Sequence, residues 1–112
     1  MRVISQSGTI DVPYDYFSLS VSSGKYKDVE VAYIYCHNLS SPNGTKLAEY
    51  STKEKAIKAM EMLRKVYENN VFYHCIASSK RFEEVQRILS EEQFRKATTE
   101  YFQFPQDDEI EV

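Results

Sequence analysis

Apolar and polar residues alternate along the first half of the chain, which predicts short β-strands. The clearest case is segment 17–23, FSLSVSS, where apolar residues alternate with serines. Shorter runs of the same kind occupy 2–5 and 9–14, with a turn expected at Gly8 between them. The N-terminal part is therefore expected to be a set of paired strands.

Segment 29–36, VEVAYIYC, is apolar on both faces after its second residue, which is typical of a central strand. A turn at 23–25, Ser-Gly-Lys, would join it to the preceding strand as a hairpin. The Asn, Ser, Pro and Gly content of 37–45 indicates a loop, and 46–50 can form one more short strand.

A long helix is predicted over 52–68. Ser51 and Glu54 have the spacing of a capping box, in which each side chain bonds to the backbone of the other residue. Behind this cap, apolar residues recur at helical spacing and charged residues occupy the opposite face. The Asn-Asn pair at 69–70 is expected to end the helix.

The remaining residues predict a strand, two helical pieces and a final strand. Segment 71–78, VFYHCIAS, is mostly apolar on both faces and indicates an interior strand. A second helix would start near Lys80, break near Ser90 and restart, and 100–105, EYFQFP, would form the last strand.

These elements predict an α+β fold: an antiparallel sheet of five to seven short strands, one long helix and a shorter helical pair. A chain of 112 residues has the size of one ordinary domain, so residues 1–112 are taken as a single domain with a short acidic tail from about 106. Hydrophobic content of 42% with 28% charged residues is typical of a globular protein.

The net charge and the N-terminal sequence exclude some classes of function. The 14 basic and 17 acidic residues give a formal charge of -3, too mild for a typical nucleic-acid-binding protein. No long apolar run occurs near the N-terminus, so we expect neither a signal peptide nor a membrane helix. We therefore expect a cytoplasmic protein with two reduced cysteines.

Two His/Cys pairs were considered as metal or catalytic sites. Cys36-His37 and His74-Cys75 contain ligands that zinc accepts, but neighbours on a strand point to opposite faces. The same separation weakens Cys75 and His74 as a nucleophile and base. Three glycines without a Gly-rich turn exclude a common phosphate loop. We expect no metal, no cofactor and no enzymatic activity.

Basic residues gather in 80–96 shortly before the aromatic residues of 101–104. Guanidinium groups suit phosphates and aromatic rings stack on bases, so together they provide the minimum set of groups for nucleotide binding. The alternative, which composition favours, is that these cations pair with neighbouring glutamates.

Three stretches, 1–14, 48–67 and 102–112, resemble small proteins common in phages and prophages of Gram-positive bacteria. The group is similar to Thoeris anti-defence sponge proteins, which capture a cyclic ADP-ribose signal, and in some cases cyclic oligonucleotides, in pockets shared between protomers. The resemblance implies a homodimer or larger homo-oligomer that sequesters a nucleotide second messenger, uncleaved, in the host bacterial cytoplasm.

The resemblance also implies which residues contact the ligand. Phe102 and Phe104 would lie near a pocket or a dimer contact. Another aromatic ring would stack on a base, and an arginine would contact the phosphates. The candidates for these two roles are Phe72 and Tyr73 for stacking, and Arg81 and Arg95 for the phosphates.

One position departs from the pattern of some relatives, which carry an arginine between the terminal aromatics. This chain has Gln103 there. Glutamine can hydrogen-bond to a phosphate or a base edge but brings no charge. The departure bears on the class of ligand and on the composition of the pocket.

Two other functions stay open. The first is a protein-directed inhibitor of a bacterial defence system, such as an anti-CRISPR, acting through an acidic or aromatic surface. The second is a structural or regulatory phage protein whose Tyr-rich sheet, drawn from nine tyrosines, forms oligomers.

Overall fold

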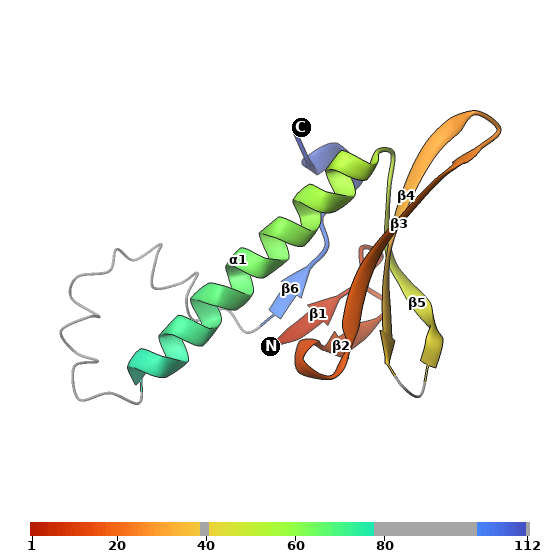
Figure 1. The fold of residues 1–112 in the computed structure, drawn as a ribbon. Coiled ribbons are helices and arrows are strands. Elements are labelled where there is room, and N and C mark those ends of the chain that lie inside the picture. Colours follow the sequence, from red (N-terminus) through yellow and green to blue (C-terminus); the bar gives the residue numbers. More distant parts are fainter. Residues whose placement is uncertain (39–40, 78–100, 112) are drawn as a thin grey trace.

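The computed structural model describes residues 1–38, 41–77 and 101–111. These residues form strands packed beside a long helix (Figure 1), and the α+β class is confirmed. No helix among them is long and apolar enough to cross a membrane. The elements are β1 (Arg2–Ile4), β2 (Asp11–Pro13), η1 (Tyr14–Tyr16), β3 (Ser18–Tyr26), β4 (Val29–Asn38), β5 (Ser41–Tyr50), α1 (Lys53–Ala77), β6 (Tyr101–Gln103) and η2 (Asp107–Glu109).

The strands form two three-stranded sheets, with the orders β2-β1-β6 and β3-β4-β5. The prediction of one antiparallel sheet of five to seven strands is therefore wrong. β1 pairs antiparallel with β2 but parallel with β6. Parallel neighbours need a long connection, and nearly the whole chain lies between β1 and β6.

The β3–β4 hairpin confirms the alternation seen in the sequence. Leu19 and Val21 pack against the core while the alternating serines at 18, 20 and 22 are exposed, and β4 is the central strand. The expected turn at 23–25 is wrong, because pairing continues to the end of β3. The turn is formed by Lys27 and Asp28, whose φ angles are 52° and 65°.

β5 is longer than expected and includes residues assigned to a loop. It begins at Ser41, although 37–45 had the composition of a connection. Its pairing with β4 shifts register twice, and Gly44 has a φ of +82°. Turn-type residues here produce an irregular strand rather than a loop.

Helix α1 begins and ends later than predicted. The backbone N–H of Lys55 donates to the Oγ1 of Thr52 across 3.1 Å, so Thr52 is the N-terminal cap in place of Ser51. The helix continues through 69–70 to Ala77, so the part of the predicted strand 71–78 that the structure describes, 71–77, is helical. Asn only weakens a helix, and a short apolar run fits a helix or a strand equally well.

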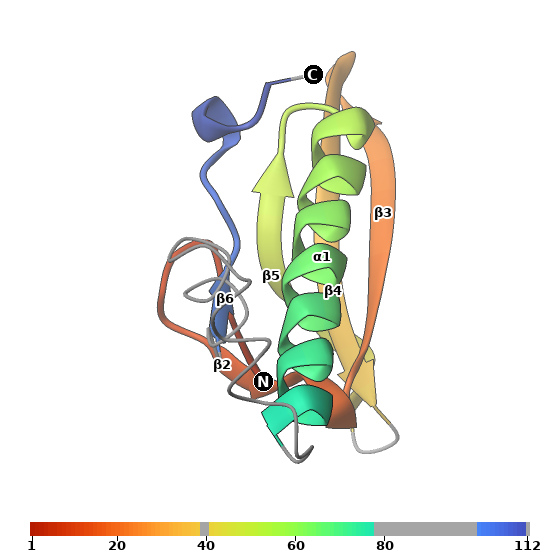
Figure 2. The ribbon, with the colours of Figure 1, turned by 90° about the vertical axis from the view of Figure 1, so that its left-hand side faces the viewer.

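The core lies between the inner faces of the two sheets and one stripe of α1. Figure 2 shows α1 lying across β3, β4 and β5. Val12, Val3 and Phe102 form one buried row in register across β2, β1 and β6. The other buried apolar residues are Ala32, Ile34, Cys36, Leu47, Ala48, Tyr50, Ala56, Ala59, Leu63, Phe104 and Ile110.

The C-terminal segment packs against the body of the protein. In the stretch expected to be a short acidic tail from about 106, Ile110 is buried and Asp107 bonds to Ser51. One apolar residue and one carboxylate of this acidic stretch thus each have a partner in the rest of the chain. The helical pair expected from Lys80 lies outside the described residues.

Candidate ligand-binding face

The two terminal phenylalanines of the expected site are core residues. Phe102 is 9% exposed and Phe104 is 1% exposed. Their rings pack edge to face, with centroids 5.3 Å apart. Both side chains point inward because they occupy alternate positions of the β6 segment. In the part of the chain that the structure describes, neither ring has a face open to a ligand.

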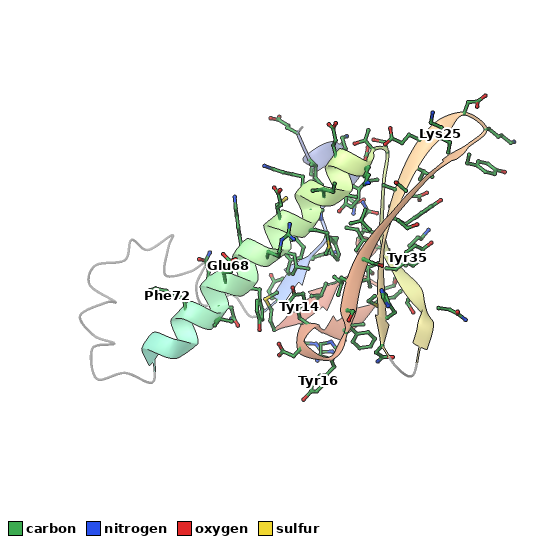
Figure 3. The ribbon with its side chains drawn as sticks, viewed as in Figure 1. Tyr14, Tyr16, Lys25, Tyr35, Glu68 and Phe72 are labelled. Atoms are coloured by element: carbon green, nitrogen blue, oxygen red, sulfur yellow. The ribbon has the colours of Figure 1, made fainter. Side chains whose placement is uncertain are left out.

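The other expected residues are not brought to one place by the described part of the chain. Phe72 is 56% exposed near the C-terminal end of α1, away from both sheets (Figure 3). Tyr73 lies on the same helix, and its side chain is outside the described residues, as are Arg81 and Arg95. Gln103 is exposed on β6.

The alternation that buries the phenylalanines turns Tyr101 and Gln103 outward. Tyr101 is 59% exposed. It is the register partner of Arg2 on β1, and Gln103 is the partner of Ile4. Side chains of paired residues lie on the same face of a sheet. We call this exposed side of the β2-β1-β6 sheet the outer face.

An ion pair orients the arginine of the outer face. The Nε of Arg2 lies 2.8 Å from the Oδ1 of Asp11, and both side chains are about half exposed. An exposed pair of this kind adds little stability. Its effect is positional, because it draws the guanidinium toward Asp11 on β2, and the guanidinium has two further nitrogen atoms for other acceptors.

A loop rich in hydroxyl groups borders Gln103. The Ser5 Oγ accepts from the backbone N–H of Ile10 at 3.1 Å, and the Ser7 and Thr9 hydroxyls lie 2.7 Å apart. Gly8 has a φ of +78°, and a Cβ there would lie 3.4 Å from the Gln103 Nε2. The edge of the outer face therefore carries uncharged hydrogen-bonding groups.

A concave feature lies at one end of the β3-β4-β5 sheet. It is a groove of about 460 Å³ at the edge of β4, which we call the β4 groove. Tyr26 and Tyr33 contribute rings, and Glu30, Glu49 and Asp107 contribute carboxylates. The groove and the outer face are built from different strands.

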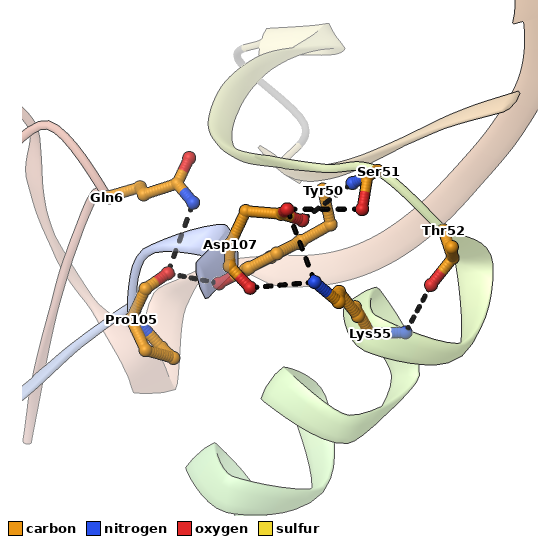
Figure 4. Close-up of polar contacts among 7 residues, drawn as sticks. All are labelled: Gln6, Tyr50, Ser51, Thr52, Lys55, Pro105 and Asp107. Carbon is orange, nitrogen blue, oxygen red and sulfur yellow. Dashed lines mark hydrogen bonds and ion pairs between the residues drawn. The ribbon is translucent and has the colours of Figure 1, made fainter. Parts of the chain in front are cut away.

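Asp107 binds the C-terminal segment to Ser51 and to Lys55 of α1, beside this groove (Figure 4). Its Oδ1 accepts from the backbone N–H of Ser51 at 2.7 Å, and its Oδ2 accepts from the Ser51 hydroxyl and the Lys55 Nζ. The Ser51 backbone bond is the main cause that holds the pKa of Asp107 below its ordinary value. Burial, with Asp107 and Glu109 nearby, raises the pKa of Tyr50.

The residues considered for metal or thiol chemistry are separated. Cys36 is buried, and burial raises the pKa of its thiol. The neighbouring His37 lies 3.1 Å from the Ser20 hydroxyl. His74 and Cys75 lie on α1 rather than on a strand, and their side chains are outside the described residues. Within 1–38, 41–77 and 101–111, no three His, Cys, Asp or Glu side chains group as metal ligands.

The sequence did not point to Arg2 of the outer face, and it included Tyr101 only among the aromatic residues of 101–104, not among the expected contact residues. The signal for Tyr101 was present, since placing Phe102 and Phe104 on one face of a strand puts Tyr101 and Gln103 on the other. Nothing local indicated Arg2.

The chain matches none of the protein families, curated proteins or solved structures with which it was compared.

Proposed function

We propose that this is a phage-encoded anti-defence protein that binds and sequesters a nucleotide immune second messenger without cleaving it. The ligand would be a cyclic ADP-ribose isomer or a cyclic oligonucleotide. The observation that carries the proposal is the juxtaposition of Arg2 and Tyr101 on the outer face, with Gln103 in the next row. A guanidinium can bind phosphate, a ring can stack on a base, and an amide can read a base edge.

The stretches that resemble small phage and prophage proteins meet in space, which supports the proposal. β1 from 1–14 pairs with β6, which overlaps 102–112. The start of α1, within 48–67, is bound to Asp107. Arg2 and Gln103 both belong to resembling stretches, so the outer face is built almost entirely from them.

A second copy of the chain would complete the site. A sheet face covers one side of a ligand, whereas tight small-molecule sites bury most of the ligand surface. Closure of a second protomer over the outer face would supply the missing wall and exclude water. The proposed active form is therefore a homodimer or larger homo-oligomer.

Binding is tested with the purified full chain against cyclic ADP-ribose isomers and cyclic dinucleotides, by thermal shift and calorimetry. Ligand at 100 times its dissociation constant should add about 2.7 kcal/mol of stability. Heat denaturation should then release intact ligand, as judged by chromatography. Degraded ligand would indicate an enzyme, and no binding across the panel would refute the proposal.

Variants locate the site. Tyr101→Ala should weaken binding about tenfold or more through lost stacking, whereas Tyr16→Ala, which removes another exposed ring, should not. Asp11→Asn removes the competing carboxylate from Arg2 and should preserve or strengthen binding. Equal loss in the Tyr101 and Tyr16 variants would move the site away from the outer face.

Protein-directed inhibition of a defence system is a second candidate. The β4 groove favours it, because carboxylates line the groove and would repel a phosphorylated ligand. Co-purification of a host protein, without stabilisation by any nucleotide, would support this function over sequestration.

A further inference from the structure

The β4 groove lies where β5 leaves the sheet. β4 begins at Val29, but its pairing with β5 begins only at Ala32, which faces Tyr50. Among the described strands, 29–31 thus have a partner only on the β3 side. Figure 1 shows the β3–β4 hairpin extending past the end of β5. An unpaired strand edge can pair with another chain.

Carboxylates are the charged groups that line the groove among the described residues. Glu30, Glu49 and Asp107 line it, and no described lysine or arginine does. Each carboxylate has a partner within the chain: Glu30 accepts from the backbone N–H of Lys53, Glu49 lies 4.0 Å from the Lys46 Nζ, and Asp107 is bound as above. A carboxylate offers about four acceptor positions, so these partners leave capacity for an added cation.

The tyrosine rings of the groove already contact ammonium groups. The Lys27 Nζ lies 5.6 Å from the centroid of Tyr26, and the Lys46 Nζ lies 5.5 Å from the centroid of Tyr33. Both distances are within the range of cation–π attraction. The Lys46 ammonium group thus lies near both the Tyr33 ring and the Glu49 carboxylate. An incoming lysine or arginine would meet the same two kinds of group in the groove.

We propose that the β4 groove binds an extended, lysine- or arginine-bearing segment of a partner protein, which adds as a strand beside 29–31. The open edge would supply main-chain hydrogen bonds, and alternate side chains of the segment would reach the rings and carboxylates. Charge complementarity selects a basic segment, because an acidic one or a nucleic acid would meet three carboxylates.

This inference deepens the second candidate function and is independent of nucleotide sequestration. The outer face uses β1 and β6, whereas the groove uses the β3–β4 hairpin, the end of β5 and Asp107. Variants of one site should leave binding at the other unchanged. Failure of either proposal can therefore be recognised separately.

The test measures fluorescence anisotropy of the full chain with a labelled, end-blocked peptide of alternating lysine and valine. A glutamate–valine peptide of equal length controls for charge, and a lysine peptide interrupted by prolines controls for strand pairing. We expect only the uninterrupted lysine peptide to bind. No binding, or equal binding of the proline peptide, would overturn the proposal.

Matched variants place the peptide. Glu49→Lys should weaken binding about tenfold, whereas Glu68→Lys, the same charge change on an exposed position of α1, should not (Figure 3). Likewise Tyr26→Ala should weaken it and Tyr16→Ala should not, since the two rings are 70% and 77% exposed. If Glu68→Lys weakens binding as much as Glu49→Lys, the peptide responds only to the overall charge of the protein. If Tyr16→Ala weakens binding as much as Tyr26→Ala, the loss of any exposed ring is sufficient. Either result would refute the site.

Two further measurements complete the test. Free tetramethylammonium should not displace the peptide at equal concentration; displacement would assign the groove to small cations instead. Each variant must keep the wild-type far-UV spectrum and Tm, and Glu49→Gln replaces Glu49→Lys if the latter fails to fold. Glu49→Gln should still weaken binding, and unchanged affinity would contradict the proposal.

Discussion

The hydroxyl of Tyr50 donates a hydrogen bond to the backbone carbonyl of Pro105 across 2.8 Å. The same carbonyl accepts from the Gln6 Nε2 at 3.1 Å (Figure 4). The Oε1 of Gln6 accepts from the backbone N–H of Glu49. Gln6, in the loop after β1, therefore joins the two sheets. The Pro105 carbonyl joins both sheets to the C-terminal segment.

Tyr50→Phe should lower the free energy of unfolding by about 1 kcal/mol, the net value of a typical internal hydrogen bond. The ring stays buried, so only the donor to Pro105 is lost. Urea unfolding followed by circular dichroism measures the change. Tyr16→Phe, at an exposed position, should change nothing, and equal effects would show that the Pro105 contact adds no stability.

Asp107 should make stability depend on acid pH. Its folded pKa lies below the ordinary value of 3.8, so its contribution is present above that pH and is lost as pH falls through the folded pKa. Asp107→Asn should lose up to about 1 kcal/mol at neutral pH, a small value because the side chain is 41% exposed. The difference between the wild-type and variant unfolding free energies should shrink below about pH 4. A constant difference from pH 7 to 2 would contradict this assignment.

The sequence predicted those elements whose periodicity matches their burial. The alternation of β3 and the apolar stripe of α1 both follow from one face packing on the core. Segment 71–77 failed because a run that is apolar on every side carries no period, and no Gly or Pro marks where the helix stops. The composition of 37–45 predicted a loop, but 37–38 and 41–45 belong to strands. The prediction failed because turn-type residues also occur in irregular strands.

The candidate site was predicted less well because it depends on a long-range pairing. Register between β1 and β6 places Arg2 beside Tyr101, and no local pattern contains that information. The alternation of side chains along a strand is enough to place Tyr101, and not Phe104, on the exposed face. The β4 groove depends on where β5 stops pairing with β4, which is likewise a tertiary fact.

Phe104→Ala should cost about 3–5 kcal/mol, because a large buried ring is replaced by a cavity. Phe72→Ala provides the matched control, since that ring is largely exposed and its removal should stay within about 0.5 kcal/mol. Denaturant unfolding of both variants gives the comparison. A small loss at Phe104 would mean that the C-terminal segment is not part of the core.

The β3–β4 turn should be improvable because two ordinary residues adopt a left-handed backbone. Lys27 and Asp28 have φ angles of 52° and 65°, the conformation for which two-residue hairpins prefer Asn-Gly. Replacing Lys27 by Asn and Asp28 by Gly should raise the unfolding free energy by about 0.5–1 kcal/mol, since the strain at both positions is relieved. Asp28→Val should act in the opposite direction, because a β-branched residue tolerates positive φ poorly. If urea unfolding ranks the Val variant equal to the Asn-Gly variant, the hairpin does not turn at these two residues.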